Sequence, residues 1–180
     1  MEILMQPREK IIRDFAEWTV VSAVRSKCPI KSREKVYPLL RMLDYNIIFK
    51  GERISNDEFN EWHKRSTTTI CDATQNILPV GWAVKYINIY LKTRVYIGNE
   101  GRSDLVKWIH PPIDGGLWKG IKENYKSNPN IIRKTHIVKQ IQDIKTYEQY
   151  KTIIEGCSLI AQERGCLLIE VEEMWQGTKI

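Results

Sequence analysis

Apolar side chains recur at helical spacing over most of the chain, and the first such segment runs from Glu9 to Lys27. Its apolar positions are Ile11, Ile12, Phe15, Trp18 and Ala23. Intervals of three and four residues place these side chains on one side of a helix. The pattern therefore predicts an N-terminal helix whose apolar face packs into the core.

Capping signals divide the rest of the chain into further helices. Ser55 with Glu58, and Thr146 with Gln149, have the spacing of capping boxes, and Asp114 is placed to accept backbone N–H groups from a following helix. The further helices are predicted at 32–44, with Pro38 inside or near the start, from 55 to about 76, at 82–96, at 103–109, at 115–125, and from 146 to Gly165.

Two segments lie outside the helical pattern. Ser127–Asn130 has the composition of a turn, and Cys166–Glu173 is apolar and rich in β-branched residues, which is compatible with a short strand. No repeat, low-complexity tract or linker interrupts the chain. The expected fold is therefore all-α, a compact single-domain helical bundle over residues 1–180.

Polar residues interrupt the most apolar of these helices, at 82–96, in a regular way. Lys85, Asn88 and Lys92 follow one another at intervals of three and four residues, so they form one narrow stripe. A polar stripe on an otherwise apolar helix is typical of a cleft wall. The alternative is that the stripe simply faces bulk water.

Positive charge is concentrated in the same part of the chain. Residues 85–139 carry eleven Lys and Arg against four acidic residues, a net +7, whereas the whole chain of 180 residues carries +6. Aromatic residues are interleaved with these basic ones. Lysines that contact phosphates and aromatic faces that stack on unpaired bases are the combination found in nucleic-acid grooves. A solvated basic surface over an aromatic core is the alternative interpretation.

The cysteines and histidines are scattered. Cys28, Cys71, Cys157 and Cys166 lack metal-ligand spacing, as do the three histidines, so we expect reduced thiols and neither a metal nor a cofactor. His63, next to Lys64 and Arg65, is expected on a solvated helix face, and His110 at a helix end. The first ten residues do not resemble a secretory signal and no apolar run reaches membrane-spanning length, so a soluble, cytoplasmic protein without membrane contact is expected.

Two short motifs within these 180 residues, in order, resemble those of the helix-hairpin-helix DNA glycosylases. The motifs are Leu78-Pro79-Val80-Gly81, followed by Lys85, and Pro112-Ile113-Asp114, followed by Leu117-Trp118. The resemblance covers about 40 residues and is to the branch that combines glycosylase and lyase activities. The 29-residue separation of Lys85 and Asp114 is nearest to the archaeal 8-oxoguanine glycosylases. The first glycine of the family hairpin is absent, and Lys85 lies further from the hairpin than usual.

The resemblance implies a fold containing a helix-hairpin-helix-like element and a role for each matched residue. Lys85 would be the nucleophile that attacks C1′ of a flipped-out nucleotide and forms a Schiff base. Asp114 would activate it and stabilise the positive charge that develops on the sugar. An apolar setting disfavours the ammonium form of a lysine, as a nucleophilic amine requires. A structural salt bridge between the two residues is the alternative.

The predicted function is therefore a DNA glycosylase with AP-lyase activity that removes an oxidised or modified base from DNA. Further candidates for nucleic-acid binding are Trp82 and Trp118, which would stack on the base, Asn88 and Lys92 on the polar stripe, and Arg102, Lys107, Lys119 and Lys122, which would contact phosphates. Two alternatives remain. One is a non-catalytic helical nucleic-acid-binding module or phage or defence accessory protein, and the other is a domain whose basic patch binds an acidic protein partner.

Overall fold

The computed structural model describes residues 6–24 and 27–177, and these fold into helices joined by short loops. The helices are α1 (Pro7–Ala23), α2 (Arg33–Arg41), α3 (Asn46–Phe49), α4 (Asn56–Ala73), α5 (Val80–Leu91), the π-helix η1 (Lys92–Ile97), α6 (Leu105–Trp108), α7 (Gly115–Tyr125), α8 (Pro129–Thr135), the 3₁₀ helix η2 (Ile141–Asp143), α9 (Tyr147–Arg164) and the 3₁₀ helix η3 (Leu168–Met174). Within the described residues no strand forms beyond one isolated bridge between Arg53 and Ser103. The predicted all-α fold is confirmed.

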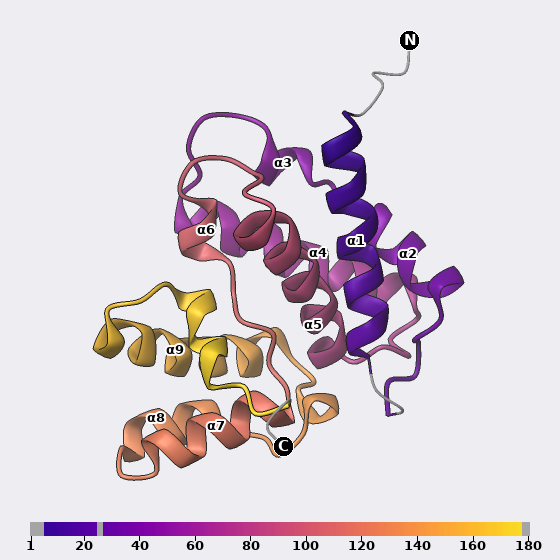
Figure 1. The fold of residues 1–180 in the computed structure, drawn as a ribbon. Helices are drawn as coiled ribbons and strands as arrows, with labels where there is room; N and C mark the ends of the chain where they lie inside the picture. The colour runs from indigo at the N-terminus through magenta and orange to yellow at the C-terminus, as the bar shows by residue number, and fades with distance from the viewer. Residues whose placement is uncertain (1–5, 25–26, 178–180) are drawn as a thin grey trace.

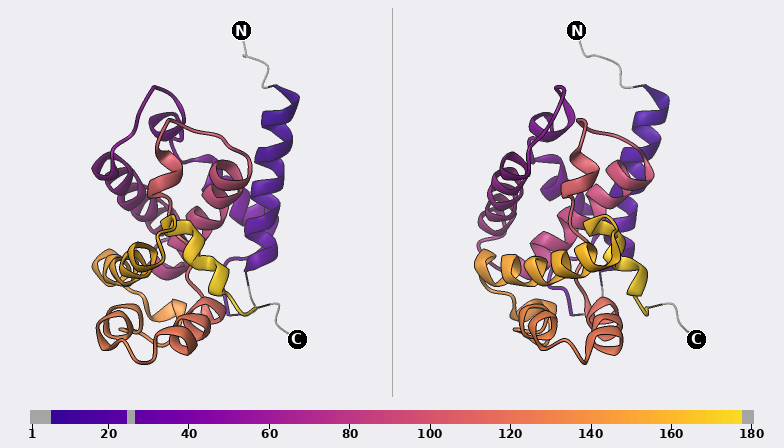
Figure 2. Two further views of the ribbon diagram at one scale, coloured as in Figure 1. Left: turned by 60° about the vertical axis from the view of Figure 1, so that its left-hand side comes forward. Right: turned by 90° about the vertical axis from the view of Figure 1, so that its left-hand side faces the viewer.

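The helices form an upper and a lower part, and α5 lies where the two parts meet (Figure 1). Figures 1 and 2 show α7, α8 and α9 below the N-terminal helices, while α1 runs along one side of the molecule. The extended segment 109–114 leads from α6 in the upper part to the start of α7 in the lower part. Buried side chains from α1 through η3 join in one hydrophobic cluster. This arrangement brings α5 and the start of α7 together, although they are far apart in sequence.

The central helix α5 is buried at almost every position, as its apolar sequence predicts. It begins at Val80, two residues before the predicted start, because Pro79 occupies the N-cap. Gly81 packs directly against the segment that contains η2. Its N–H donates to the carbonyl of Ile144 at 3.1 Å, and a Cβ atom on residue 81 would overlap the carbonyl oxygen of Ile141. The segment Leu78–Gly81 thus leads into α5, and because Gly81 has no side chain, the segment around Ile141 can pack against it.

The capping signals locate several helix ends correctly. Both predicted capping boxes form, Asp114 caps α7, and Gly165 ends α9 in the left-handed conformation with φ of 64°. The helix that begins after Ser55 ends at Ala73 rather than near Asn76, because Gln75 and Asn76 take positive φ. Local hydrogen-bonding chemistry therefore sets these boundaries.

Two local predictions need correction. The predicted turn at 127–130 is present only in its first part, at Ser127, and the rest of the segment starts helix α8, because Asn128 accepts from the N–H of Ile131 and Pro129 stands at the first helical position. Cys166–Glu173 does not form a strand but contains most of η3, in which Ile169 and Val171 are buried. A short apolar run does not distinguish a buried strand from a buried helix, and the described residues offer no strand for it to pair with.

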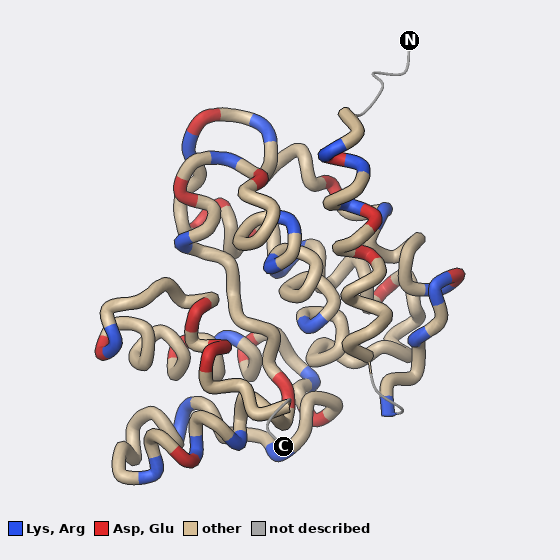
Figure 3. The backbone as a smooth tube through the Cα atoms, in the orientation of Figure 1, with Lys and Arg blue, Asp and Glu red and all other residues tan. Residues whose placement is uncertain are grey.

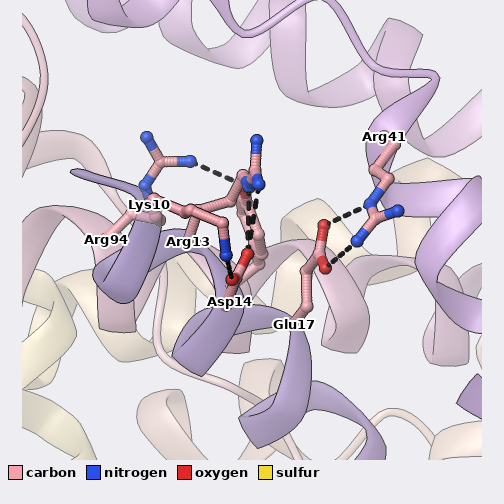
Figure 4. A network of polar contacts seen from close by, with 7 residues as sticks. Lys10, Arg13, Asp14, Glu17, Arg41 and Arg94 are labelled. Atoms are coloured by element: carbon pink, nitrogen blue, oxygen red, sulfur yellow. Dashed lines mark hydrogen bonds and ion pairs between the residues drawn. The ribbon is translucent and has the colours of Figure 1, made fainter. Parts of the chain in front are cut away.

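The outward face of α1 is a third correction. Ala16 and Val20 are buried as a core face requires, but Ile11, Phe15 and Trp18 are largely exposed. The prediction that these three residues pack into the core is therefore wrong. The helix also buries the charged residue Glu17, whose carboxylate accepts two hydrogen bonds from the Arg41 guanidinium of α2 (Figure 4).

Candidate active site

The polar stripe of α5 faces the lower part of the molecule, where each residue has a partner. The Lys85 ammonium lies 3.1 Å from Asp114, the Asn88 amide donates to the hydroxyl of Tyr150 at 2.8 Å, and the Lys92 ammonium lies 2.8 Å from Glu172. Lys85 and Asn88 are only 3% and 0% exposed. The alternative that this stripe faces bulk water is therefore wrong for both residues.

Asp114 is held by hydrogen bonds to both of its carboxylate oxygens. Oδ1 accepts from the backbone N–H groups of Gly116 and Leu117, at 2.9 and 3.1 Å, and from the indole N–H of Trp175 at 2.9 Å. Oδ2 accepts from Lys85 at 3.1 Å. The helix cap and the indole thus aim the second oxygen at the lysine.

The Lys85 ammonium also has an aromatic neighbour. Its nitrogen lies 5.5 Å from the centre of the Trp82 ring, which comes from one turn earlier on α5. The Lys85 side chain is 4% exposed, whereas that of Asp114 is 23% exposed. Solvent therefore reaches the pair from the carboxylate side.

That open side is a pocket of about 440 Å³, which Lys85 and Asp114 both line. Trp82, Trp118 and Trp175 line it as well. Trp82 and Trp118 are only 3% and 5% exposed, so neither offers a free ring face to a base, and the prediction that these two residues stack on it is wrong, whereas Trp175 is half-buried. The Trp118 indole donates to the carbonyl of Thr135, while the buried indole N–H of Trp82 has no acceptor among the described residues. The remaining lining residues are Lys27, Gly115, Gly116, Lys139, Gln140, Ile141, Gln142 and Gly177. The pocket thus combines an ion pair, three indoles and two peripheral lysines.

Trp175 is the main residue of this site that the sequence did not indicate. It lies 61 residues after Asp114, just beyond a segment predicted as a strand. Its indole packs so closely on Gly116 that a Cβ there would collide with it. The Gly115-Gly116 pair in the first turn of a helix was the available signal, because glycine is unfavourable there unless another group approaches closely.

The predicted phosphate-binding residues divide into two groups. Lys119 and Lys122 are exposed on α7, the helix that Asp114 caps, and Figure 3 shows several basic positions in this part of the chain. Arg102 and Lys107 do not line the pocket. Arg102 donates to the carbonyl of Ile47, and Lys107 pairs with Asp104 at 2.6 Å. Only the first group lies on an element of the pocket.

The prediction for His63 is wrong, because the residue is fully buried in a polar cluster rather than placed on a solvated face. Its Nδ1 lies 2.8 Å from the Tyr147 hydroxyl, and its Nε2 lies 2.9 Å from the Asn88 amide oxygen. His110 is also buried, with Nδ1 2.8 Å from the Tyr150 hydroxyl. Burial lowers the pKa of His63 to about 4 and that of His110 well below its ordinary value. Both imidazoles are therefore neutral in the folded protein at pH 7.

Other site types find no residues to support them in the described part of the chain. Over residues 6–24 and 27–177, no three His, Cys, Asp or Glu side chains are grouped so that they would hold a metal ion. Among the same residues, no helix has the length and apolar character needed to cross a membrane.

Comparison with protein-family models, with curated proteins and with solved structures finds no match to this chain.

Proposed function

We propose that the protein is a DNA glycosylase with AP-lyase activity, in which Lys85 is the nucleophile and Asp114 the activating carboxylate. One observation carries the proposal: the ion pair of Lys85 and Asp114 lies in a pocket lined by three indoles. A structural salt bridge needs neither the pocket nor the indoles. An aromatic base that leaves the duplex needs flat apolar surfaces around it and a nucleophile beside its sugar.

The proposed reaction uses these two groups in sequence. Asp114, 3.1 Å away, accepts a proton from the Lys85 ammonium, and the lone pair of the resulting amine attacks C1′ of the nucleotide. The C1′–N bond to the base breaks, and the base leaves with the electron pair and takes up a proton. Opening of the sugar ring then gives a Schiff base between Lys85 and C1′, from which β-elimination cleaves the strand.

The surrounding residues have binding roles in this proposal. Trp175, the half-buried indole of the pocket, supplies an apolar surface for the extruded nucleotide, while the buried Trp82 and Trp118 support the pocket wall. Lys27 and Lys139 at the pocket, with Lys119 and Lys122 on α7, contact phosphates. Lys92 and Asn88 act indirectly. Lys92 pairs with Glu172, and Asn88 ties α5 to Tyr150 from within the core.

Borohydride trapping tests the proposal, because reduction of the Schiff base leaves a stable covalent adduct. Wild-type protein is incubated with DNA that contains 8-oxoguanine or an abasic site, and an adduct is expected. Lys85→Gln should reduce adduct formation at least about a thousandfold, since the nucleophile is lost. Lys134→Gln, which removes a surface lysine paired with Glu155, is the matched control and should trap normally.

Two results would overturn the proposal. One is the absence of an adduct with wild-type protein on both substrates, and the other is undiminished trapping by Lys85→Gln. Salt-sensitive DNA binding without an adduct, weakened as much by Lys122→Ala as by Lys85→Gln, would indicate the non-catalytic nucleic-acid-binding module instead.

A further inference from the structure

The outward face of α1 carries two exposed aromatic rings that stack on each other. The ring centres of Phe15 and Trp18 are 5.6 Å apart and their planes differ by 20°. The two residues are 50% and 45% exposed, and Ile11 extends the apolar stripe by one turn. Lys10 and Arg13 pair with Asp14 on the same helix, and Glu17 pairs with Arg41 of α2 (Figure 4). The helix therefore presents flat aromatic surface to solvent.

This stacked pair is next to the pocket of the proposed active site. Trp18 lines a hollow of about 240 Å³ whose other walls include Ser22, Asp114 and Trp175. Asp114 and Trp175 also line the larger pocket that contains Lys85. The aromatic stripe thus ends at a hollow that shares Asp114 and Trp175 with the pocket of the proposed chemistry.

We propose that Phe15 and Trp18 form a stacking platform for unpaired bases of a DNA strand, next to the nucleotide that enters the Lys85–Asp114 pocket. The inference rests on the proposed function and specifies the form of its substrate. Every base has a π-face, so an aromatic pair binds unpaired bases without regard to sequence. A closed duplex hides those faces. The platform therefore gives the protein a preference for single-stranded or locally opened DNA.

Charge and ring geometry favour this occupant over a protein segment. The chain carries a net charge of +6, and Lys27 and Lys139 lie at the adjoining pocket, where they would meet the phosphates of the same strand. Because the two rings stack on each other, an outer ring face can continue the stack onto a base, which fits that face better than the irregular side chains of a protein helix do.

Binding of undamaged DNA tests the platform without any reaction. Fluorescence anisotropy compares a labelled single strand of mixed sequence with its duplex. In the double variant Phe15→Leu/Trp18→Leu, the apolar surface stays but the rings are lost. We expect single-strand affinity to fall by on the order of tenfold per ring, and duplex affinity to change little. Met42→Ala, which alters a half-exposed apolar residue at the end of α2, is the control.

The outcomes separate the platform from the proposed chemistry. Unchanged single-strand affinity in the double variant overturns the platform, and an adduct in borohydride trapping would then leave the proposed function standing. A ring-dependent loss of affinity without any adduct keeps the platform and rejects the lyase. Sedimentation velocity adds a further check, because a dimer that becomes monomeric in the double variant with unchanged DNA affinity would assign this face to a second copy of the chain. Thermal melting verifies that the variants fold.

Discussion

Lys85 and Asn88 lie one turn apart on α5 and are both buried, yet their surroundings differ. Asn88 is enclosed by His63, Tyr150 and the carbonyl of Pro111, and each of its amide atoms has a partner. Lys85 has one charged partner, Asp114, and that partner lines an open pocket. One polar cluster is sealed within the core, and the other is open to ligands.

This difference shows why burial of polar residues does not by itself identify an active site. Both clusters are centred on the same stripe of α5 and contain buried hydrogen bonds, and the sealed one even contains two histidines. The sealed cluster stabilises the junction of the two parts of the fold, because its members come from α4, α5, α9 and the segment 109–114. Access to solvent, together with the three indoles, makes the Lys85 cluster the candidate for chemistry.

After loss of the Lys85 nucleophile itself, the largest expected effect separates charge from capping at Asp114. Asp114→Asn keeps an oxygen that caps α7 and accepts from Trp175, but it removes the group that would accept the lysine proton. We expect the trapping rate to fall on the order of 100-fold, and the melting temperature to fall as well, because the buried Lys85 ammonium loses its charged partner while the helix cap remains. Asp104→Asn, which alters a carboxylate paired with Lys107, should leave both unchanged. Trapping at the wild-type rate by Asp114→Asn would remove the carboxylate from the mechanism.

Changes in the sealed cluster around Asn88 should lower stability and leave trapping intact. Asn88→Ala leaves His63 Nε2 and the carbonyl of Pro111 without a partner, so the free energy of unfolding should fall by about 3 kcal/mol. Where the variant is folded, trapping by Lys85 should continue. Denaturant unfolding measures the loss, and Asn124→Ala, at an exposed amide on α7, should cost less than about 0.5 kcal/mol. A stable Asn88→Ala protein that fails to trap would show that the sealed cluster is part of the active site.

Acid should weaken the sealed cluster before it affects most carboxylates. The pKa of His63 is about 4 in the folded protein and about 6.5 when unfolded, so between these values the unfolded state binds a proton that the folded state does not. Stability is thus full above pH 6.5 and falls as the pH drops toward 4. Melting temperatures from pH 7.5 to 5 measure this fall, and His63→Gln should reduce its slope. A melting temperature that stays constant or rises on acidification contradicts the neutral, buried histidine.

The smallest expected effect concerns Trp175. Trp175→Phe retains most of the ring but loses the N–H that donates to Asp114, so trapping should slow by roughly tenfold, the equivalent of one hydrogen bond to a charged group. Trp108→Phe is the matched control, because it removes an indole hydrogen bond to the carbonyl of Ile54 outside the pocket. Equal trapping by the two variants would show that Trp175 does not position the carboxylate.

The sequence by itself determined the local features that depend on neighbouring residues. Helical periodicity predicted the all-α fold, and side chains that reach backbone N–H groups three residues away located the caps at Ser55, Asp114 and Thr146. The spacing of Lys85 and Asn88 also placed them on one stripe. These features involve short stretches of chain, so the pattern of residue types is sufficient to predict them.

Only the tertiary structure decided which of these residues meet and which face solvent. Lys85 on α5 contacts Asp114, the N-cap of α7, across 29 residues of chain, and Trp175 reaches Asp114 across 61 residues through space that Gly116 leaves open. Periodicity likewise predicted one buried apolar face for α1, whereas packing buried Ala16 and Val20 and left Phe15 and Trp18 outside. A helical pattern shows which side chains share a face. The elements that fold against the helix determine whether that face is core, pocket or surface.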